Sequence, residues 1–253
     1  GVFHNLVIIS IDKRFPMQAR RLMNALWGMG QMSFVKTIIV VDNTIDVHNT
    51  KEMYKLLLNK IDFKRDLFFS EGILDVLNHA SDRAIYGSKL GIDGTNKIKG
   101  EDGFEAKLES TSMIPLPLPK TILKKFTEFK SCRIVERESL HRVVFATLDK
   151  KCPHQGRGVI DKFMSDQECS SITVLVVLEG HENVNDTSTV LWKILNNIDP
   201  KRDVHCFGNR LGIDVTCKTG EDGYTQNWPD EIEMSDEVKQ TVDQKWKKIF
   251  NEP

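Results

Sequence analysis

The segment best suited to chemistry is a glycine-rich stretch with one lysine, Gly87-Ser88-Lys89-Leu90-Gly91. Glycine backbone can present several N–H groups to one anion, and a neighbouring lysine adds a positive charge. This combination suits a phosphate group. The pattern is weaker than a P-loop, because Leu90 stands where that motif places serine or threonine. An ordinary glycine turn with a solvated lysine is the alternative, and the commoner outcome for such a segment.

Other groups of reactive side chains are weaker candidates. The acidic segments 100–103 and 220–223 lack the ligand spacing of a calcium loop, so we expect turns. Glu136-Arg137-Glu138 lies in a highly charged stretch that is typical of a solvated surface. His4 and His141 each precede an apolar run, where a structural histidine is the common outcome. A pocket role for His4 stays open.

These segments belong to a chain that repeats itself. Residues 4–66 return without a gap as residues 141–203, at a constant offset of 137 residues. The match is best at its end, where Ile61–Asp66 returns as Ile198–Asp203 with one substitution. A fixed offset indicates that one supersecondary unit occurs twice.

A second matching block follows at a shorter offset. Gly87–Asp93 returns as Gly208–Asp214, 121 residues later, so the first copy carries about 16 extra residues between Phe69 and Tyr86. An insertion confined to one copy is expected to form a loop on one face, and loops on rigid scaffolds commonly carry function. The first copy is therefore the better candidate for chemistry.

Composition narrows the class of protein. With 253 residues, 40% of them hydrophobic, the chain can bury a sizeable core. A net charge of -1 gives no electrostatic case for nucleic acid or an anionic membrane, and no apolar run is long enough for a transmembrane helix. The five cysteines are irregularly spaced, which indicates reduced, mostly buried thiols. We expect a cytoplasmic protein without a membrane span.

Each copy reads as strand, helix, strand, helix and strand. The β-branched runs Thr37–Val41 and Val174–Leu178 are typical of strands covered on both faces. A helix with a wide apolar stripe is predicted over Met17–Met32. Asn49 or Thr50 is expected to cap the second helix of the first copy, and Asp186 or Thr187 that of the second.

This alternation predicts layered α/β units with a largely parallel or mixed central sheet, internally duplicated. We expect residues 1–131 to form the first copy, with a short helix over Thr121–Lys130 near its end. Residues 132–253 would form a degenerate second copy that ends in an amphipathic helix capped by Ser235.

Four runs between Gly1 and Lys97 also carry a family resemblance: GVFHNLVIISIDKRFPMQARRLMNALWGMGQM, TIIVVDNTIDVHN, ILDVLNHAS and GSKLGIDGTNK. They resemble the C-terminal domain of the UbiD-type decarboxylases. That family removes CO2 from aromatic and unsaturated acids, including polyprenyl-4-hydroxybenzoate precursors of ubiquinone and related menaquinone intermediates. Its members use prenylated FMN, a divalent metal that is usually Mn, and potassium. The second copy resembles the family only faintly.

The resemblance implies roles for particular residues. The lysine that matches Lys89, with Gly87 and Ser88, contacts the cofactor phosphate. In the family, the segments that match the start of the chain and the inserted loop border the substrate pocket. The residues expected in this pocket are Phe3, His4, Asn5 and Leu74, together with Ile92 of the glycine-rich block. Because Arg210 replaces the lysine and the loop is absent, the second copy is expected to bind no flavin.

The family's catalytic Glu-Arg-Glu network and metal ligands belong to a domain that would precede Gly1. We therefore expect no catalytic or metal-binding residue in this chain. It would instead form one wall of the cleft, contact the cofactor phosphate and provide subunit contacts. The expected protein is a homo-oligomer that acts on a small aromatic acid. Two alternatives stay open: a structural or oligomerisation module without catalytic function, and a phosphate-binding or nucleotide-binding domain.

Overall fold

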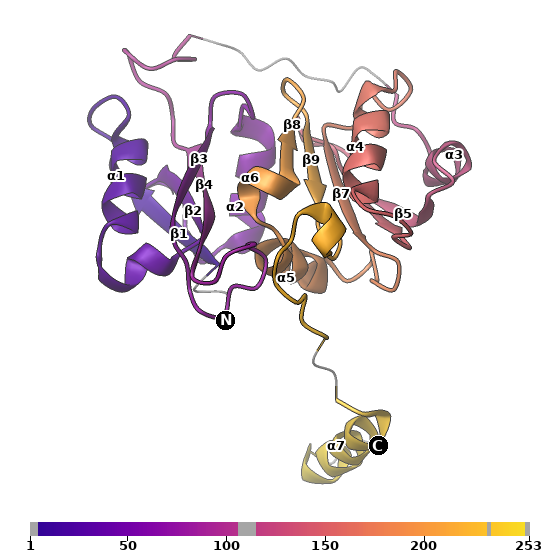
Figure 1. Ribbon diagram of the computed structural model, residues 1–253. Helices are drawn as coiled ribbons and strands as arrows, with labels where there is room; N and C mark the ends of the chain where they lie inside the picture. The colour runs from indigo at the N-terminus through magenta and orange to yellow at the C-terminus, as the bar shows by residue number, and fades with distance from the viewer. Residues whose placement is uncertain (1–4, 106–114, 232–233, 251–253) are drawn as a thin grey trace.

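The computed structural model describes residues 5–105, 115–231 and 234–250, and the strands within these ranges form two sheets (Figure 1). The first sheet has the order β1-β2-β4-β3, formed by Leu6–Ile11, Thr37–Asp42, Tyr86–Gly94 and Leu67–Ile73. The second has the order β5-β6-β7-β9-β8, formed by Phe129–Glu136, Val143–Leu148, Val174–Glu179, Leu211–Asp214 and Val204–Cys206. The edge strand β3 is antiparallel to its neighbour in the first sheet. In the second sheet, both edge strands, β8 and β5, are antiparallel to their neighbours.

The strand register follows the repeat of the sequence. Val40 pairs with Ile9 and Asp93, and Val177 pairs with Ala146 and Asp214. Each residue of the second set lies at the offset that the sequence predicts. The expected layered α/β fold, with a mixed sheet in each copy, is therefore confirmed.

Helices cover both faces of each sheet. In the first copy they are α1 (Gln18–Trp27), the 3-10 helix η1 (Gly30–Phe34) and α2 (Thr50–Lys60). In the second copy they are α4 (Gln155–Ser165), α5 (Thr187–Asn197), α6 (Pro200–Asp203) and the 3-10 helix η2 (Gly220–Asp222). Asn49 and Asp186 cap α2 and α5 as predicted. The helix predicted over Met17–Met32 ends early, at Trp27, where Gly28 forms the C-cap before η1 begins.

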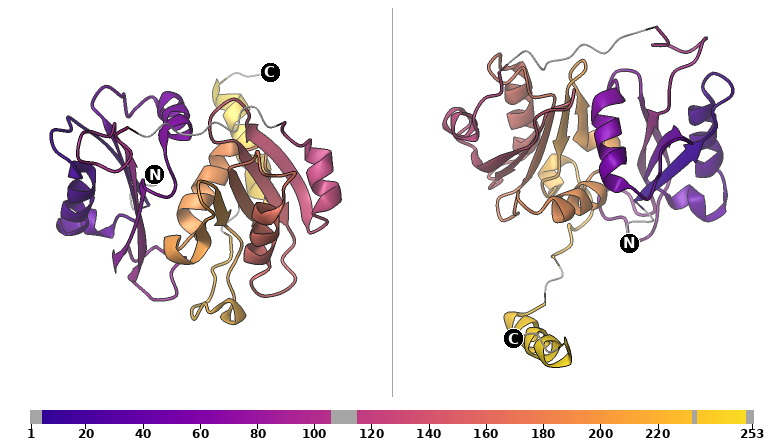
Figure 2. Two further views of the ribbon diagram at one scale, coloured as in Figure 1. Left: turned by 90° about the horizontal axis from the view of Figure 1, so that it is seen from above. Right: turned by 180° about the vertical axis from the view of Figure 1, so that it is seen from behind.

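The two copies share one central core. A cluster of buried residues joins Leu57 of α2 and Phe69 of β3 to Phe145 of β6 and Val190 of α5. Figures 1 and 2 show the resulting layers: α1 lies outside the first sheet, α2 and α5 lie between the sheets, and α4 lies outside the second. This arrangement places the second helix of each copy against the other copy.

The segment between the copies belongs structurally to the second one. The expected division after residue 131 falls inside β5, which pairs along its length with β6. The helix near it, α3 (Pro119–Lys125), packs through Ile122 against the core of the second copy rather than ending the first. The charged stretch around Arg133 forms part of an edge strand, where alternate side chains can remain in water.

The C-terminal helix α7 (Asp236–Phe250) has no buried residue, and Ser235 caps it as predicted. No helix of the described ranges is long and apolar enough to cross a membrane. The cysteines are unpaired as expected, but the expectation that most are buried was wrong, since only Cys169 is buried and Cys152 and Cys206 are exposed. Cys152 lies in the loop after β6, and Cys206 is the last residue of the edge strand β8.

Candidate functional site

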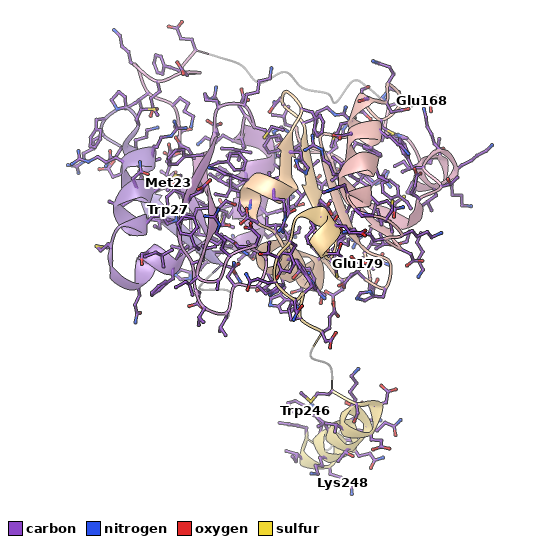
Figure 3. The ribbon with its side chains drawn as sticks, viewed as in Figure 1. Met23, Trp27, Glu168, Glu179, Trp246 and Lys248 are labelled. Carbon is purple, nitrogen blue, oxygen red and sulfur yellow. The ribbon has the colours of Figure 1, made fainter. Side chains whose placement is uncertain are left out.

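The glycines of Gly87–Gly91 suggested a turn, but this segment lies within strand β4. Its glycines permit close packing instead of a bend. A Cβ atom at Gly91 would lie 2.4 Å from Met23 Sδ, and one at Gly87 would lie 2.0 Å from Ser81 Oγ. Met23 and its neighbour Trp27, labelled in Figure 3, lie on the helix α1 that covers this strand.

Lys89 is buried and its ammonium group bonds to backbone. Nζ donates hydrogen bonds to the carbonyl oxygens of Ser33 (2.6 Å) and Val35 (2.9 Å), and it lies 5.9 Å from the centre of the Trp27 ring. Removal from water lowers the pKa of Lys89 to about 8. Lys89 therefore links β4 to the segment that follows α1.

In the second copy, Arg210 likewise donates hydrogen bonds to backbone carbonyl oxygens. Its guanidinium donates to the carbonyl oxygens of Cys169 (2.9 Å), Ile172 (2.9 Å) and Met164. Ile172 lies 137 residues after Val35, so the two cations contact equivalent backbone. The glycine-rich block thus recurs in a position where a cation joins the central sheet to the first helix of each copy.

Ser88 contacts the other copy. Its N–H donates to Asp199 Oδ2 (3.1 Å), its hydroxyl bonds to Asp199 Oδ1, and its Oγ accepts from the N–H of Lys201 (2.9 Å). The equivalent Asn209 accepts from the N–H of Phe63 (2.8 Å). These reciprocal contacts form part of the interface between the copies.

The other predicted pocket residues do not converge on one cavity. Phe3 and His4 lie outside the described residues. Asn5 donates a hydrogen bond to Asn196 Oδ1 of the second copy at 2.6 Å. Leu74 is 1% exposed, and Ile92 packs against the central core. Their role in a substrate pocket stays a prediction.

The insertion of the first copy forms a long hairpin and a loop that reach the second copy. Arg202 donates to the carbonyl oxygen of Ala80 (2.8 Å), and Ser81 Oγ donates to Asp199 Oδ2 (2.8 Å). His79 contacts the edge of the Trp228 ring at 5.0 Å between centres. Further hydrogen bonds join His79 to Asn197, the His79 carbonyl to Tyr224, the Ser81 carbonyl to Gln226 and the Asp82 carbonyl to Thr225.

Lys36 is a buried residue of this interface that the sequence analysis missed. Its Nζ donates to Asn78 Oδ1 (2.9 Å) and to the carbonyl oxygens of Asn196 (3.2 Å) and Ile198 (3.1 Å). Burial lowers the pKa of Lys36 to about 7, although the carboxylates of Asp199 and Asp203 oppose the shift. A single lysine between apolar residues just before a buried strand was the signal in the sequence.

A cavity of about 610 Å³ lies at the carboxyl end of β4, beyond the predicted phosphate segment of the same strand. Its lining comes from α1, from β3 and the turn before it, and from β4 and the loop after it, and includes Arg20, Lys64, Phe68, Asp93 and Lys97. Sequence reasoning missed this site, because its residues come from segments far apart in the chain.

The carboxylates in this cavity are paired. Lys97 Nζ lies 2.9 Å from Asp66 Oδ1 and 3.0 Å from Asp93 Oδ2. Burial would raise the pKa of Asp93, but Lys97 and the hydrogen bonds from Thr95 outweigh burial and lower it. Glu101 accepts from Lys13 and from the N–H of Met17 at the start of α1. These pairs build the walls of the cavity.

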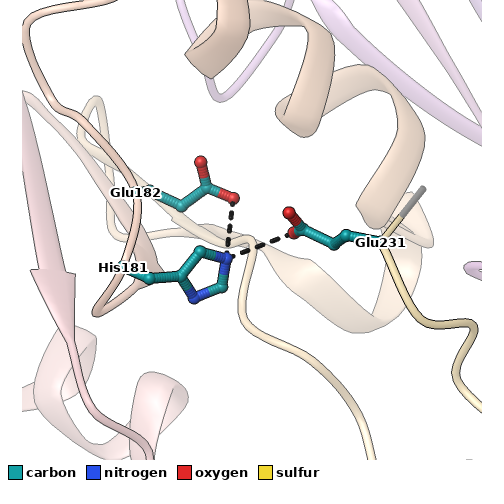
Figure 4. Close-up of side chains that lie close together, drawn as sticks. All are labelled: His181, Glu182 and Glu231. Atoms are coloured by element: carbon teal, nitrogen blue, oxygen red, sulfur yellow. Dashed lines mark hydrogen bonds and ion pairs between the residues drawn. The ribbon is translucent and has the colours of Figure 1, made fainter. Parts of the chain in front are cut away.

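One group of metal-ligating side chains lies in the second copy. His181 Nε2 is 3.6 Å from Glu182 Oε1 and 3.3 Å from Glu231 Oε1 (Figure 4). The ammonium group of Lys193 bonds to both carboxylates, 2.8 Å from Glu182 Oε1. Since the ammonium group of Lys193 already occupies the space between these two carboxylates, we assign no metal to them.

Comparison with known proteins identifies the family. The family described as 3-octaprenyl-4-hydroxybenzoate carboxy-lyase C-terminal domain matches residues 1–94 and 111–225, which cover both copies. The chain belongs to this UbiD C-terminal domain family. Its membership confirms the resemblance found in the first copy and extends it to the second.

Individual relatives are longer than this chain. An uncharacterised protein of Helicobacter pylori strain J99 is 31% identical over 256 residues, which cover 97% of this chain and 38% of that protein. An uncharacterised protein of Archaeoglobus fulgidus is 40% identical over 106 residues, which cover 42% of this chain and 22% of that protein. The chain thus spans less than half the length of these relatives.

Two solved structures superimpose in part. Vanillic acid decarboxylase of Sedimentibacter hydroxybenzoicus in its closed form has a TM-score of 0.41 and 15% identity, covering 54% of this chain and 32% of that one. The UbiD-class enzyme HmfF of Pelotomaculum thermopropionicum, in complex with prenylated FMN, has a TM-score of 0.39 and 15% identity, covering 69% and 43%.

Proposed function

We propose that the full-length protein is a carboxy-lyase that removes CO2 from an aromatic or unsaturated acid, such as a polyprenyl-4-hydroxybenzoate-type quinone precursor. Membership of the UbiD family is the observation that supports this reaction class. We further propose prenylated FMN as the cofactor, with Mn and potassium held by residues outside this chain. When bound, the flavin serves as the electron sink for the loss of CO2.

The chain itself is proposed to support the catalytic part of the protein without taking part in the reaction. The residues Gly87–Lys89 leave no open cradle for a phosphate, because Ser88 bonds to Asp199 and Lys89 bonds to backbone carbonyl oxygens. A contact between Lys89 and the cofactor phosphate would require its ammonium group to leave Ser33 and Val35. We therefore derive no catalytic step from this chain.

The reaction is tested with full-length protein loaded with prenylated FMN and a panel of aromatic and unsaturated acids. We expect CO2 release from at least one acid, and none from the isolated 253-residue chain. CO2 release by the isolated chain would contradict the proposed division of labour. A loaded full-length protein that is inactive on the whole panel would contradict the reaction class.

The role of Lys89 is tested through flavin retention. A phosphate contact predicts that Lys89→Ala lowers the flavin content per subunit after gel filtration, while Arg210→Ala does not. If Lys89 acts only as a structural link, both variants lose stability and both keep their flavin when they are folded. Unfolding midpoints measured on the same samples separate these two results.

We also infer a role in homo-oligomer assembly, which the exposed helix α7 favours. Its apolar residues Val242, Trp246 and Ile249 are 52%, 54% and 69% exposed. Figure 3 labels Trp246 on this helix. Acidic Asp236 and Glu237 occupy its first turn, whereas basic residues occupy its last. Two copies of α7 packed antiparallel would cover the apolar faces and place opposite charges together.

This assembly is tested by light scattering after gel filtration of the isolated chain. We expect wild type to dimerise and Trp246→Ser to be monomeric. Gln240→Ser, on the opposite side of the helix, is the matched control and should still dimerise. A wild-type chain that stays monomeric at tens of micromolar would contradict the inference.

A further inference from the structure

The cavity beside β4 has the position and size of a ligand site. In open α/β sheets, ligands commonly bind outside the carboxyl ends of the strands. Asp93, near the end of β4, and Arg20 of α1 both line the cavity. Its volume of about 610 Å³ lies within the range of small-molecule sites.

The unpaired charges of this cavity are mainly positive. Asp66 and Asp93 are neutralised by Lys97 together with Arg65, which bonds to Asp66, and Glu101 is neutralised by Lys13. Within the described ranges, by contrast, no carboxylate pairs with Arg20 or Lys64. Asp102 is exposed at the rim and is the remaining acid of the lining.

Arg20 lies over an aromatic ring. Its guanidinium carbon is 4.7 Å from the centre of the Phe68 ring. Such stacking positions a guanidinium group while its N–H donors stay available in the plane of the group. An oxyanion that meets these donors would thus find them held in place, with the apolar surface of Phe68 and Leu67 next to them.

The second copy neutralises the equivalent arginine. Arg157, 137 residues after Arg20, donates to Asp161 at 2.9 Å and contacts the ring nitrogen of His205. Asn24 occupies the position of Asp161 in the first copy, and Phe68 occupies that of His205. The same scaffold therefore carries an engaged arginine in one copy and an available one in the other.

We propose that the cavity beside β4 binds a small organic anion, a carboxylate or phosphate attached to a flat apolar body. The oxyanion is held by Arg20 and Lys64, and the apolar body lies against Phe68 and Leu67. This site goes beyond the proposed decarboxylation, and its test does not depend on prenylated FMN or on turnover.

The test is titration calorimetry on the complete 253-residue chain with benzoate, phenyl phosphate and inorganic phosphate as separate probes. We expect saturable binding of at least one organic anion at one site per chain, and weaker binding of inorganic phosphate. Arg20→Gln should weaken the organic anion at least about tenfold, because it removes charged hydrogen-bond donors. Lys64→Gln should weaken it less.

Two further variants make the test specific. Asn24→Asp places a carboxylate one helical turn from Arg20, as Asp161 is placed from Arg157, and should weaken binding while the exposed position leaves the fold intact. Arg157→Gln is the matched control and should bind like wild type. The proposal is overturned if no probe binds, if inorganic phosphate binds as tightly as the organic anions, or if Arg157→Gln loses as much affinity as Arg20→Gln.

Discussion

The β3–β4 hairpin and the β8–β9 hairpin occupy equivalent positions in the two copies, yet they contact the other copy to different extents. The first hairpin and its loop supply Ser81 and Ser88, which both bond to Asp199. The second supplies Asn209, which accepts a single hydrogen bond from Phe63. The extra residues of the first copy have therefore added surface to the interface between the copies.

The first prediction compares the two aspartates at this interface. Asp199 is 8% exposed and accepts hydrogen bonds from Ser81 and Ser88, whereas its equivalent Asp62 accepts from the exposed N–H of Lys64. Asp199→Asn should lower the free energy of unfolding by about 2–4 kcal/mol, because it sets amide donors against buried hydroxyl donors. Asp62→Asn should cost less than about 1 kcal/mol. Urea unfolding checks both; equal costs would contradict the asymmetry of the interface.

The second prediction compares the buried cations. Arg210→Met removes donors from three carbonyl oxygens, and Lys89→Met removes donors from two. We expect losses of about 2–3 kcal/mol and about 1–2 kcal/mol in the free energy of unfolding, since buried carbonyl groups are left without partners. Chemical denaturation of the two variants gives the order, and a neutral Lys89→Met would show that its hydrogen bonds do not stabilise the fold.

The third prediction concerns pH and Lys36, which has no titratable counterpart because Thr173 occupies the equivalent position. The pKa of Lys36 is lowered to about 7 in the folded chain, so between pH 7 and 10 the unfolded chain binds more protons at this site. This contribution to stability therefore rises with pH above about 7 and is constant below it.

Unfolding free energies of wild type and Lys36→Met, each at pH 7 and 8.5, isolate this effect, because the ionisation of the thiols contributes equally to both proteins. Lys36→Met should reduce the rise with pH, whereas Thr173→Val should leave it unchanged. An identical rise in wild type and Lys36→Met would mean that Lys36 stays charged in the folded chain.

The architecture was predictable from the sequence because a repeat imposes its register. The matched offsets placed Val40 and Val177 in equivalent strands, and the pairings of both residues agree. Helix capping by Asn49 and Asp186 was also predictable, since an N-cap depends on residues close in the chain.

The contacts at Lys89 and Ser88 could not be inferred in this way. Two glycines beside a lysine suggest a turn, but whether glycine serves a bend or a close approach depends on what packs against it. Here Met23 and Ser81 come from other segments. The cavity beside β4 was missed for the same reason, because sequence spacing does not show that Arg20 and Phe68 meet across 48 residues.

The last prediction compares the turns of the two hairpins, where the smallest effects are expected. Ile85 adopts a φ of 55° before β4, and Gly208 adopts a φ of 65° before β9. A β-branched residue is strained in this left-handed region, whereas glycine is not. Ile85 is 55% exposed, so its replacement removes little buried surface.

Ile85→Gly should therefore raise the free energy of unfolding by between zero and about 1 kcal/mol. The substitution relieves backbone strain in the folded chain, but the greater freedom of glycine in the unfolded chain offsets part of this gain. Gly208→Ala should cost about 1 kcal/mol, because only its backbone would be strained. The new Cβ has room, since its nearest neighbour is Lys64 Cε at 3.4 Å. Thermal unfolding of both variants gives the signs. If Ile85→Gly destabilised the chain by more than about 1 kcal/mol, the side chain of Ile85 would be stabilising the long hairpin through its contacts.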